Sequence, residues 1–318
     1  MNSLVGDQAG MVDYLPGVSA VISTWNRIED LRANLNALRK QTWPIDEIIV
    51  VDNASSDNTA ERVRNEFPDV RLLVMPDSSA GACETFNVGF KAVRHKFTII
   101  MDDDVVAPPD WLERIMKRFE VEPSTTGMIS SKVVEPNMPE SFTKAESVNT
   151  IRYISTFRGC GTVALSDVIR RAGYYDEKFF IYGNERDLSA RVMNLGYRIL
   201  QFPLAELFHR TPFGMRGGNR SIYYHTRNYW LYAFKNCKWV TVFCTAFKLG
   251  FKGLGLYAAD ENDTNDATGT IGLSEAIHKT PGGLWSALTG TLAAFCLLPY
   301  CLRNRKVCKA PDFKPPLS

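Results

Sequence analysis

In Phe97-Thr-Ile-Ile-Met-Asp-Asp-Asp104, an apolar run leads directly into three consecutive carboxylates. A short run without polar alternation is typical of a strand that is buried on both faces of a sheet. Three adjacent like charges repel one another, so they need a partner. We therefore predict a buried strand over residues 97–101 that ends at a polar site.

Strand and helix patterns alternate on the amino-terminal side of this stretch. Short apolar runs predict strands, and apolar residues at helical spacing predict helices. The expected strands are 18–23, 48–51 and 71–75, and the expected helices are 29–40, 57–67 and 80–93. This alternation with short loops predicts an α/β fold with a doubly wound, mostly parallel sheet.

Polar clusters follow three of these strands at their carboxyl ends. The clusters are residues 24–27, 52–55 and 102–104. Open α/β sheets bind ligands outside the carboxyl ends of their strands. We therefore expect these clusters to line one binding site.

The rest of the chain divides into two parts. Up to about residue 215, we expect a helix after Pro108 and Pro109, a loop over 135–150, helices over 166–172 and 185–195, and a strand over 197–202. The part after that is aromatic and apolar. We expect a lead (1–17), a catalytic domain (18–215) and a helical carboxy-terminal extension (216–318).

Asp102 and Asp104 are candidate metal ligands. Side chains alternate in an extended segment, so these two carboxylates are expected to point to the same side. Hard carboxylate oxygens suit Mg²⁺ or Mn²⁺, and a metal held there can bridge a diphosphate. A solvated acidic turn is the alternative.

Asp52 ends the second expected strand and is a candidate nucleotide ligand. The alternative is an Asx turn or a cap for the following helix. Because Ser55, Ser56 and Asp57 can supply that cap, we expect Asp52 to be free for a ligand.

Glu185 and Asp187 open the helix expected over 185–195. A carboxylate near a helix start is stabilised in its ionised form, so Glu185 is a candidate general base. Asp187 and Arg191 are four residues apart and are expected to form an ion pair.

His209 and Arg210 follow an apolar run over 202–208. A neutral imidazole is a common metal ligand, and an arginine can pair with phosphate. A structural histidine is the alternative reading of His209.

Composition excludes several functions. The 318 residues include 37 basic and 35 acidic side chains, a net charge of +2, so no overall field attracts nucleic acid. The seven cysteines form no Cys-x-x-Cys pair, and reduced thiols in a cytosolic compartment fit best. No dinucleotide, P-loop or nucleophile-elbow motif occurs, so the sequence lacks the usual motifs of enzymes that transfer hydride or phosphoryl groups.

Four blocks, taken in order, resemble the family-two glycosyltransferases, which have the GT-A fold. The blocks are Val18–Arg27, Gln41–Thr59, Met101–Pro108 and Gly183–Tyr197. The third block resembles that family's metal-binding D-x-D block, and the fourth resembles the block written E-D-x-D-L-x-x-R. The triple-Asp block and the run Tyr223–Asn228 are similar to bacterial rhamnosyl- and galactofuranosyltransferases.

The resemblance implies transfer of a sugar, with inversion, from a nucleotide-diphosphate sugar such as a UDP- or dTDP-sugar. It implies that Asp104 and His209, with Asp102, bind Mn²⁺ or Mg²⁺, and that Glu185 is the base. Glu185 stands where that family usually has an aspartate. The residues implied to bind the nucleotide are Thr24, Asn26, Arg27, Asp52 and Asp102. The implied supporting residues are Asp103, Asp187, Arg191 and Arg210.

The implied acceptor is a hydroxyl of a glycan or of a lipid-linked molecule, in cell-surface polysaccharide synthesis. Two other functions stay open: a nucleotide-sugar-binding scaffold without turnover, and a sugar nucleotidyltransferase. A nucleotidyltransferase usually has a Gly-rich, basic loop after its first strand, whereas residues 24–30 contain one arginine and no glycine.

Residues 280–302 carry no charge and are long enough to span a bilayer. The first 26 residues contain no Lys or Arg, so we expect no secretory signal and a cytoplasmic catalytic domain. A second span over 239–257 would have to bury Lys248 and Lys252. We therefore expect peripheral helices on the inner leaflet, with basic residues against anionic lipid. A helical lid packed on the catalytic domain is the alternative.

Overall fold

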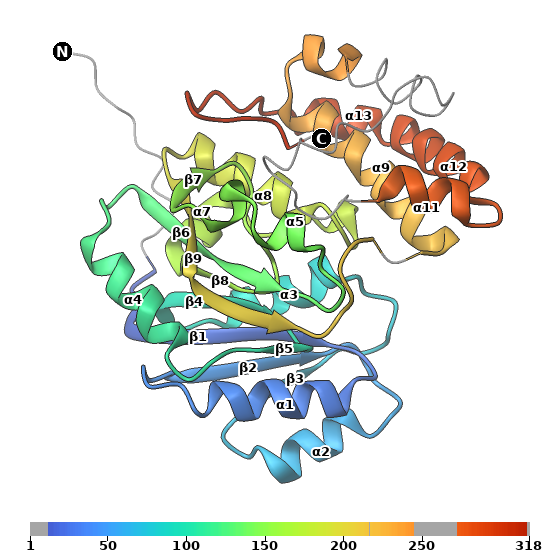
Figure 1. Ribbon diagram of the computed structural model, residues 1–318. Helices are drawn as coiled ribbons and strands as arrows, with labels where there is room; N and C mark the ends of the chain where they lie inside the picture. Colours follow the sequence, from blue (N-terminus) through green and yellow to red (C-terminus); the bar gives the residue numbers. More distant parts are fainter. Residues whose placement is uncertain (1–11, 216, 245–271, 317–318) are drawn as a thin grey trace.

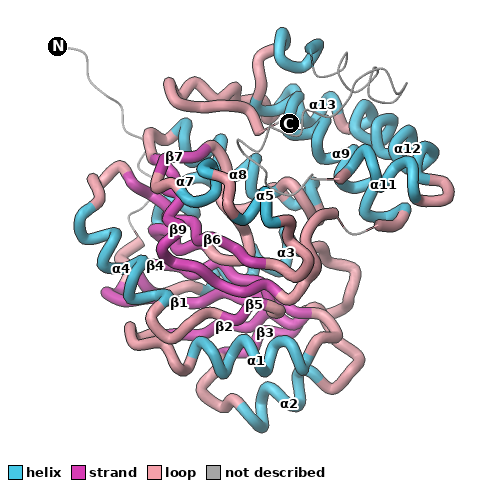
Figure 2. The backbone as a smooth tube through the Cα atoms, in the orientation of Figure 1, coloured by secondary structure: helices cyan, strands magenta, loops and turns pink. Residues whose placement is uncertain are grey.

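A mixed nine-stranded sheet forms the centre of the computed structural model, which describes residues 12–215, 217–244 and 272–316 (Figure 1). The strand order is β3-β2-β1-β4-β8-β6-β9-β5, and β7 pairs with β9. Helices lie on both sides of the sheet (Figure 2). The predicted α/β class is confirmed.

The amino-terminal strands form the parallel half of the sheet. They are β1 (Leu15–Thr24), β2 (Glu47–Asp52), β3 (Arg71–Val74) and β4 (His95–Asp102). Thr24 pairs with Asp52, and Ser23 pairs with Asp102. The carboxyl ends of β1, β2 and β4 therefore lie level at one edge of the sheet.

The other half of the sheet mixes strand directions. β8 (Thr162–Leu165) is antiparallel to β4 and to β6 (Thr126–Val134), whereas β6 and β9 (Arg198–His209) are parallel. The short strands β5 (Val105–Val106) and β7 (Arg152–Ile154) run antiparallel to β9.

Two apolar layers cover the two faces of the sheet. Successive side chains of β1 point to opposite faces of the sheet: Val21 belongs to one buried cluster and Ile22 to the other. On the Ile22 side lie α1 (Ile28–Leu38), α2 (Thr59–Glu66) and α4 (Trp111–Val121). On the Val21 side lie α3 (Ala82–Ala92), α7 (Ser166–Ala172) and α8 (Asn184–Asn194).

The carboxy-terminal helices continue the Val21 layer. α9 (Asn219–Asn236) packs on α8, and its Trp230 and Phe234 lie in the same apolar cluster as Leu188 of α8. Helices α11 (Leu273–Lys279), α12 (Gly283–Cys296) and α13 (Leu298–Arg303) pack on α9. The division at residue 215 stays a prediction.

Helix α12 lies within the uncharged stretch over 280–302 and packs on α9, which itself belongs to the expected extension. Among the described residues, no helix combines the length and the hydropathy needed to cross a bilayer. Residues 1–11 of the expected lead and 245–257 of the expected second span lie outside the described residues.

Two expectations differ from the structure. The segment 135–150 is not all loop, since it contains the one-turn helices α5 (Glu140–Thr143) and α6 (Glu146–Asn149). Strand β6 was not expected, and the aromatic segment before α8 includes the short 3₁₀ helix η1 (Glu177–Phe179).

Candidate active site

The acidic turn is the segment Asp102–Asp104 at the end of β4. Asp102 closes the strand, while Asp103 and Asp104 form the turn into β5. The buried Asn34 of α1 holds this turn, because its Nδ2 donates to the carbonyls of Asp102 (3.2 Å) and Val105 (2.8 Å). The two outer carboxylates do share a side, but a turn brings this about instead of the extended segment that we expected.

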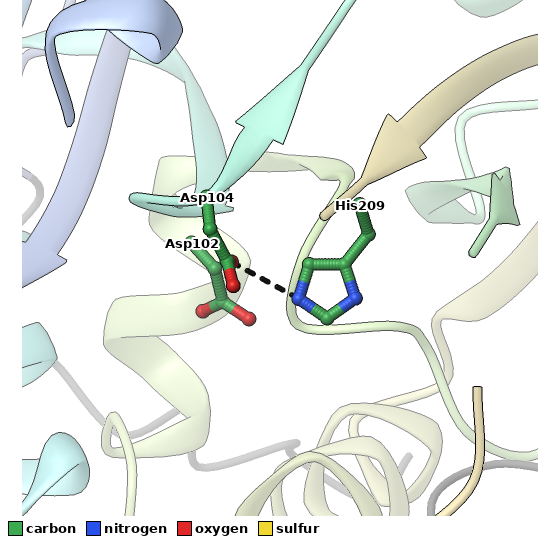
Figure 3. A group of neighbouring side chains, drawn as sticks. All are labelled: Asp102, Asp104 and His209. Atoms are coloured by element: carbon green, nitrogen blue, oxygen red, sulfur yellow. Dashed lines mark ion pairs between the residues drawn. The ribbon is translucent and has the colours of Figure 1, made fainter. Parts of the chain in front are cut away.

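His209 reaches the acidic turn through strand pairing. Val105 of β5 is paired with His209 at the end of β9, and the Arg210 amide donates to the Asp104 carbonyl. His209 Nε2 lies 3.0 Å from Asp104 Oδ1. Ligand atoms of Asp102, Asp104 and His209 all lie within 4.8 Å of one another (Figure 3). The structure thus brings together the three residues predicted to bind metal.

Cationic and hydroxyl groups surround Asp104. Its Oδ2 accepts hydrogen bonds from Arg27 (2.9 Å) and Thr211 (2.6 Å). The buried Asp103 accepts from Thr24 (2.7 Å) and, like Asp104, from Arg27 (3.3 Å). On the far side of the imidazole, His209 Nδ1 lies 2.7 Å from a carboxylate oxygen of Glu135.

These contacts shift the pKa values of the cluster in opposite directions. Burial raises the pKa of Asp102 to about 6 and that of Asp103 to about 7. Burial alone would raise the pKa of Asp104 too, but the His209 and Thr211 contacts lower it well below the usual range. Burial opposes the charge of His209, yet Asp104 and Glu135 raise its pKa to about 10. Asp104 is thus a permanently ionised carboxylate.

The donor set fits a divalent cation. Two carboxylates and an imidazole converge on one point, and oxygen donors of this kind suit Mg²⁺ and Mn²⁺. Glu135 fixes the orientation of the His209 ring, a role that carboxylates commonly play behind a histidine ligand.

Glu185 lies in the same pocket as the acidic turn. The pocket has a volume of about 460 Å³, and its wall includes Asp102, Asp104, His209 and Glu185. Asn184 Nδ2 donates to Glu185 Oε1 (3.1 Å), and burial raises the pKa of Glu185. A Cβ on Gly159 would lie 2.6 Å from that oxygen, so only glycine leaves room for the carboxylate there.

The segment before α8, here called the aromatic loop (residues 179–183), has an unusual backbone. Phe180, Tyr182 and Gly183 all have positive φ, which is rare for the two aromatic residues. The buried Asn228 of α9 holds the loop, because its Nδ2 donates to the carbonyls of Phe179 (2.8 Å), Ile181 (2.6 Å) and Tyr182 (2.8 Å).

The residues implied to bind nucleotide are spread over two places. Arg27 and Asp102 line the pocket, whereas Thr24, Asn26 and Asp52 are not among its lining residues. Asn26 is tied to a neighbouring loop, where its Oδ1 accepts from the Ser56 amide (2.7 Å).

The expectation that Asp52 is free for a ligand is wrong for one of its oxygens. Asp52 is fully buried, and its Oδ1 accepts from the amide and hydroxyl of Ser55, which makes the Asx turn given as the alternative. Its Oδ2 is buried without a hydrogen-bond partner.

Two supporting residues have structural partners. The predicted ion pair is present, with Arg191 2.9 Å from the fully buried Asp187. Arg210, predicted to pair with phosphate, instead points away from the pocket and pairs with Asp30 of α1 at 2.8 Å. The alternation of side chains at the end of β9 explains this, because His209 takes the inward direction.

Sequence reasoning missed several residues of the pocket wall. Glu135 and Thr211 contact the metal cluster, and His225 stacks on Tyr182 with ring centroids 4.2 Å apart. Burial lowers the pKa of His225 to about 3, so this imidazole is neutral. In the sequence, only the aromatic run over 223–228 pointed to this part of the pocket wall.

Comparison with known proteins bears directly on this site. Residues 19–159, a range that contains the acidic turn, match the family model described as Glycosyl transferase family 2. Over these residues the chain is similar to that family.

The curated relatives that the chain matches extend beyond the part they share with it. The chain is 25% identical to chondroitin synthase of Escherichia coli over 244 residues, which cover 63% of this chain and 35% of the synthase. It spans between 35% and 65% of the length of such relatives.

Solved structures share the fold of this chain. Staphylococcus aureus TarS 1–349, in complex with UDP-GlcNAc, matches with a TM-score of 0.56 at 14% identity, over 89% of this chain and 92% of that one. A mannosyltransferase from Pyrobaculum calidifontis, in complex with GDP-Man and Mn²⁺, matches with a TM-score of 0.54 at 18% identity, over 92% and 79%. The expected GT-A fold, with helices at its carboxyl end, is confirmed.

Proposed function

We propose that this protein is a metal-dependent, inverting glycosyltransferase that uses a nucleotide-diphosphate sugar as donor. One observation carries the proposal: Glu185 and the cluster of Asp102, Asp104 and His209 line the same pocket. A buried carboxylate with a raised pKa beside a cation site is the arrangement that sugar transfer to a hydroxyl requires.

The cluster and Arg27 form the proposed donor site. Asp104, His209 and Asp102 would hold Mn²⁺ or Mg²⁺, which when bound neutralises the negative charge of a diphosphate. Arg27 lies beside Asp104 and can pair with a phosphate oxygen. The unpartnered Asp52 Oδ2 supports a role near the nucleoside, with Thr24 and Asn26 at the same sheet edge.

Glu185 is the proposed general base. It accepts the proton of an acceptor hydroxyl, whose oxygen forms a bond to the anomeric carbon of the donor. The bond from that carbon to the diphosphate breaks on the opposite face, and the nucleoside diphosphate leaves with the electron pair. Attack from the opposite face inverts the anomeric configuration.

The proposed acceptor is a glycan or lipid-linked hydroxyl at the cytoplasmic face of the membrane, within cell-surface polysaccharide synthesis. Relatives named for chondroitin and poly-β-1,6-N-acetylglucosamine synthesis support a polysaccharide product. Structural neighbours hold UDP-GlcNAc or GDP-Man, which supports a nucleotide-sugar donor. The similarity to rhamnosyl- and galactofuranosyltransferases stays a prediction.

The proposal is tested by a donor screen. Protein with Mn²⁺ or Mg²⁺ is offered UDP-, dTDP- and GDP-sugars, and both thermal stabilisation and slow donor hydrolysis are measured. We expect a metal-dependent response to one donor that Asp104→Asn abolishes. Asp69→Asn, in an exposed ion pair with Arg39, is the matched control and should keep the response.

The two alternatives predict other results in the same screen. A scaffold without turnover would be stabilised by a donor but would neither hydrolyse nor transfer it. A nucleotidyltransferase would form a sugar nucleotide from a sugar phosphate and a nucleoside triphosphate.

A further inference from the structure

Helix α12 carries two different apolar faces. One face consists of small residues that pack on α9: Gly283, Ser286, Gly290 and Ala294 are all buried. A Cβ on Gly290 would lie 2.6 Å from the backbone carbonyl oxygen of Tyr223, so the two helices approach as closely as their backbones allow.

The opposite face of α12 is large, apolar and exposed. It presents Leu284, Trp285, Leu288 and Leu292, whose exposed fractions are 63%, 66%, 49% and 54%. At its edge, Phe295 is 50% exposed and packs against Trp230 and Phe234 of α9. These positions fall on one side of an α-helix, and α12 contains no charged residue. A contiguous apolar surface of this kind marks an interaction site for a partner or a membrane.

The charges at the two ends of α12 show what chemistry covers this face. Exposed Lys279 precedes the helix, and exposed Arg303, Lys306 and Lys309 follow it. Among the described residues near α12, Glu275 pairs with Lys279 itself, and Asp312 pairs with Arg198. The net basic charge therefore lies at the carboxy-terminal end of the helix. An apolar stripe with a basic end matches an anionic lipid surface.

The position of α12 relative to the pocket fits the same partner. Helix α9 lies between them: its Trp230 donates to Thr291 of α12 (3.2 Å), while its His225 and Tyr229 line the pocket. Packed helices are about 8–10 Å apart, so two helix layers, α9 and α12, separate the exposed face of α12 from the pocket wall.

We propose that α12 lies flat on an anionic bilayer through this apolar face. The inference rests on the proposed function and deepens it, because an acceptor held in the same bilayer would be kept within two helix layers of the pocket. The helix would enter the headgroup region without crossing the membrane, and the basic residues that follow it would contact lipid phosphates.

Vesicle flotation of the full chain tests this inference. Phosphatidylcholine vesicles with and without phosphatidylglycerol are compared, at low and at high salt. We expect binding to the anionic vesicles that weakens as salt rises. The double variant Trp285→Glu/Leu288→Glu should reduce this binding about tenfold or more.

The control variant is Val121→Glu, which places the same charge at a 73% exposed apolar residue at the end of α4. It should bind vesicles like the wild type. Both variants change exposed side chains, and the donor-induced thermal shift shows that each retains the folded pocket.

Three results would overturn the inference. The first is wild-type protein that does not bind anionic vesicles, and the second is a dimer in light scattering that the double variant breaks. The third is a Trp285 signal, taken as the difference between wild type and Trp285→Phe, that is already shielded from acrylamide without vesicles. The last two would show that a second copy or another part of the chain covers the face. Because the donor screen needs no membrane, failure here leaves the proposed transferase activity separately testable.

Discussion

At the scale of residues, the carboxylates of the pocket divide by their surroundings. Asp104 is held between His209, Thr211 and Arg27, which keep it ionised. Glu185 has the amide of Asn184 as its close side-chain partner, and burial raises its pKa. In active sites, neighbouring acids take different roles because their surroundings move their pKa values apart.

The raised pKa of Glu185 predicts the acid limb of a pH–rate profile. A base works when ionised, so activity is lost as the pH falls through its pKa. Because burial moves that pKa upward, kcat/KM should decline at a pH above the ordinary glutamate range of about 4.3. The profile of donor turnover measures this, with thermal stability recorded at each pH as a control. An acid limb at or below the ordinary range would contradict the assignment.

At the scale of elements, two helices hold the aromatic loop in its strained conformation. Asn228 of α9 bonds three of its carbonyls, and the Cys83 amide of α3 donates to the Phe180 carbonyl at 3.0 Å. The loop ends at Gly183, the residue directly before α8, and Glu185 lies in the first turn of that helix. The loop therefore fixes the position of Glu185, the proposed base.

Removing this support should slow the reaction more than it weakens donor binding. We expect Asn228→Ala to reduce kcat about tenfold or more, because a small displacement of a catalytic group is costly, with little change in the KM for donor. Thr226→Val is the matched control, since the buried Thr226 hydroxyl on the same helix has no hydrogen-bond partner. Equal losses in both variants would show general damage to α9 instead of a positioning role.

The elements that could be predicted from sequence are those whose apolar residues recur at a clear spacing. Leu31, Leu35 and Leu38 are buried on α1 as their spacing predicts. Strand β6 was not predicted because buried serines interrupt its apolar run. Ser131 accepts from the Trp111 indole (2.9 Å) and Ser130 from the Arg158 amide (2.9 Å), so tertiary contacts satisfy polar groups that seem exposed in the sequence.

At the scale of the whole molecule, a buried ionic cluster joins the extension to the catalytic part. Lys235 of α9 pairs with Asp176, and it lies 2.7 Å from the fully buried Asp187 of α8. Tyr300 of α13 donates to Asp176 at 2.9 Å. Burial opposes the charge of Asp187, but Arg191 and Lys235 lower its pKa to about 2.

Breaking this cluster should destabilise the protein strongly. Asp187→Asn leaves Lys235 and Arg191 under-compensated, and we expect a loss of about 3–5 kcal/mol in the free energy of unfolding. Asp167→Asn, in a half-buried pair with Arg170 at the protein surface, should lose about 1 kcal/mol or less. Denaturant unfolding measures both, and similar losses would contradict the account.

The stabilisation that Asp187 contributes through Arg191 and Lys235 depends on pH. The folded pKa of Asp187 is depressed, so its stabilisation is fully present above the ordinary aspartate pKa of about 3.9 and is lost as the pH falls toward about 2. Asp187→Asn should therefore remove part of the stability difference between neutral and acidic pH.

The cluster of Asp102, Asp104 and His209 could be predicted in part from sequence, because polar residues that follow apolar runs mark the strand ends of an α/β sheet. Its completion could not, since Glu135 meets His209 only through the parallel pairing of β6 with β9, which places Val134 beside Phe208. Arg210 and Asp52 were misjudged because neither strand direction nor turn geometry is visible in the residue pattern.

The central claim is that the pocket binds a nucleotide-diphosphate sugar and that Glu185 performs the transfer step. The most direct test measures binding and turnover separately in wild type and Glu185→Gln, with the donor found by the screen and the divalent metal present. The account predicts unchanged donor affinity by calorimetry and turnover reduced by at least about a hundredfold. Full turnover in Glu185→Gln would contradict it.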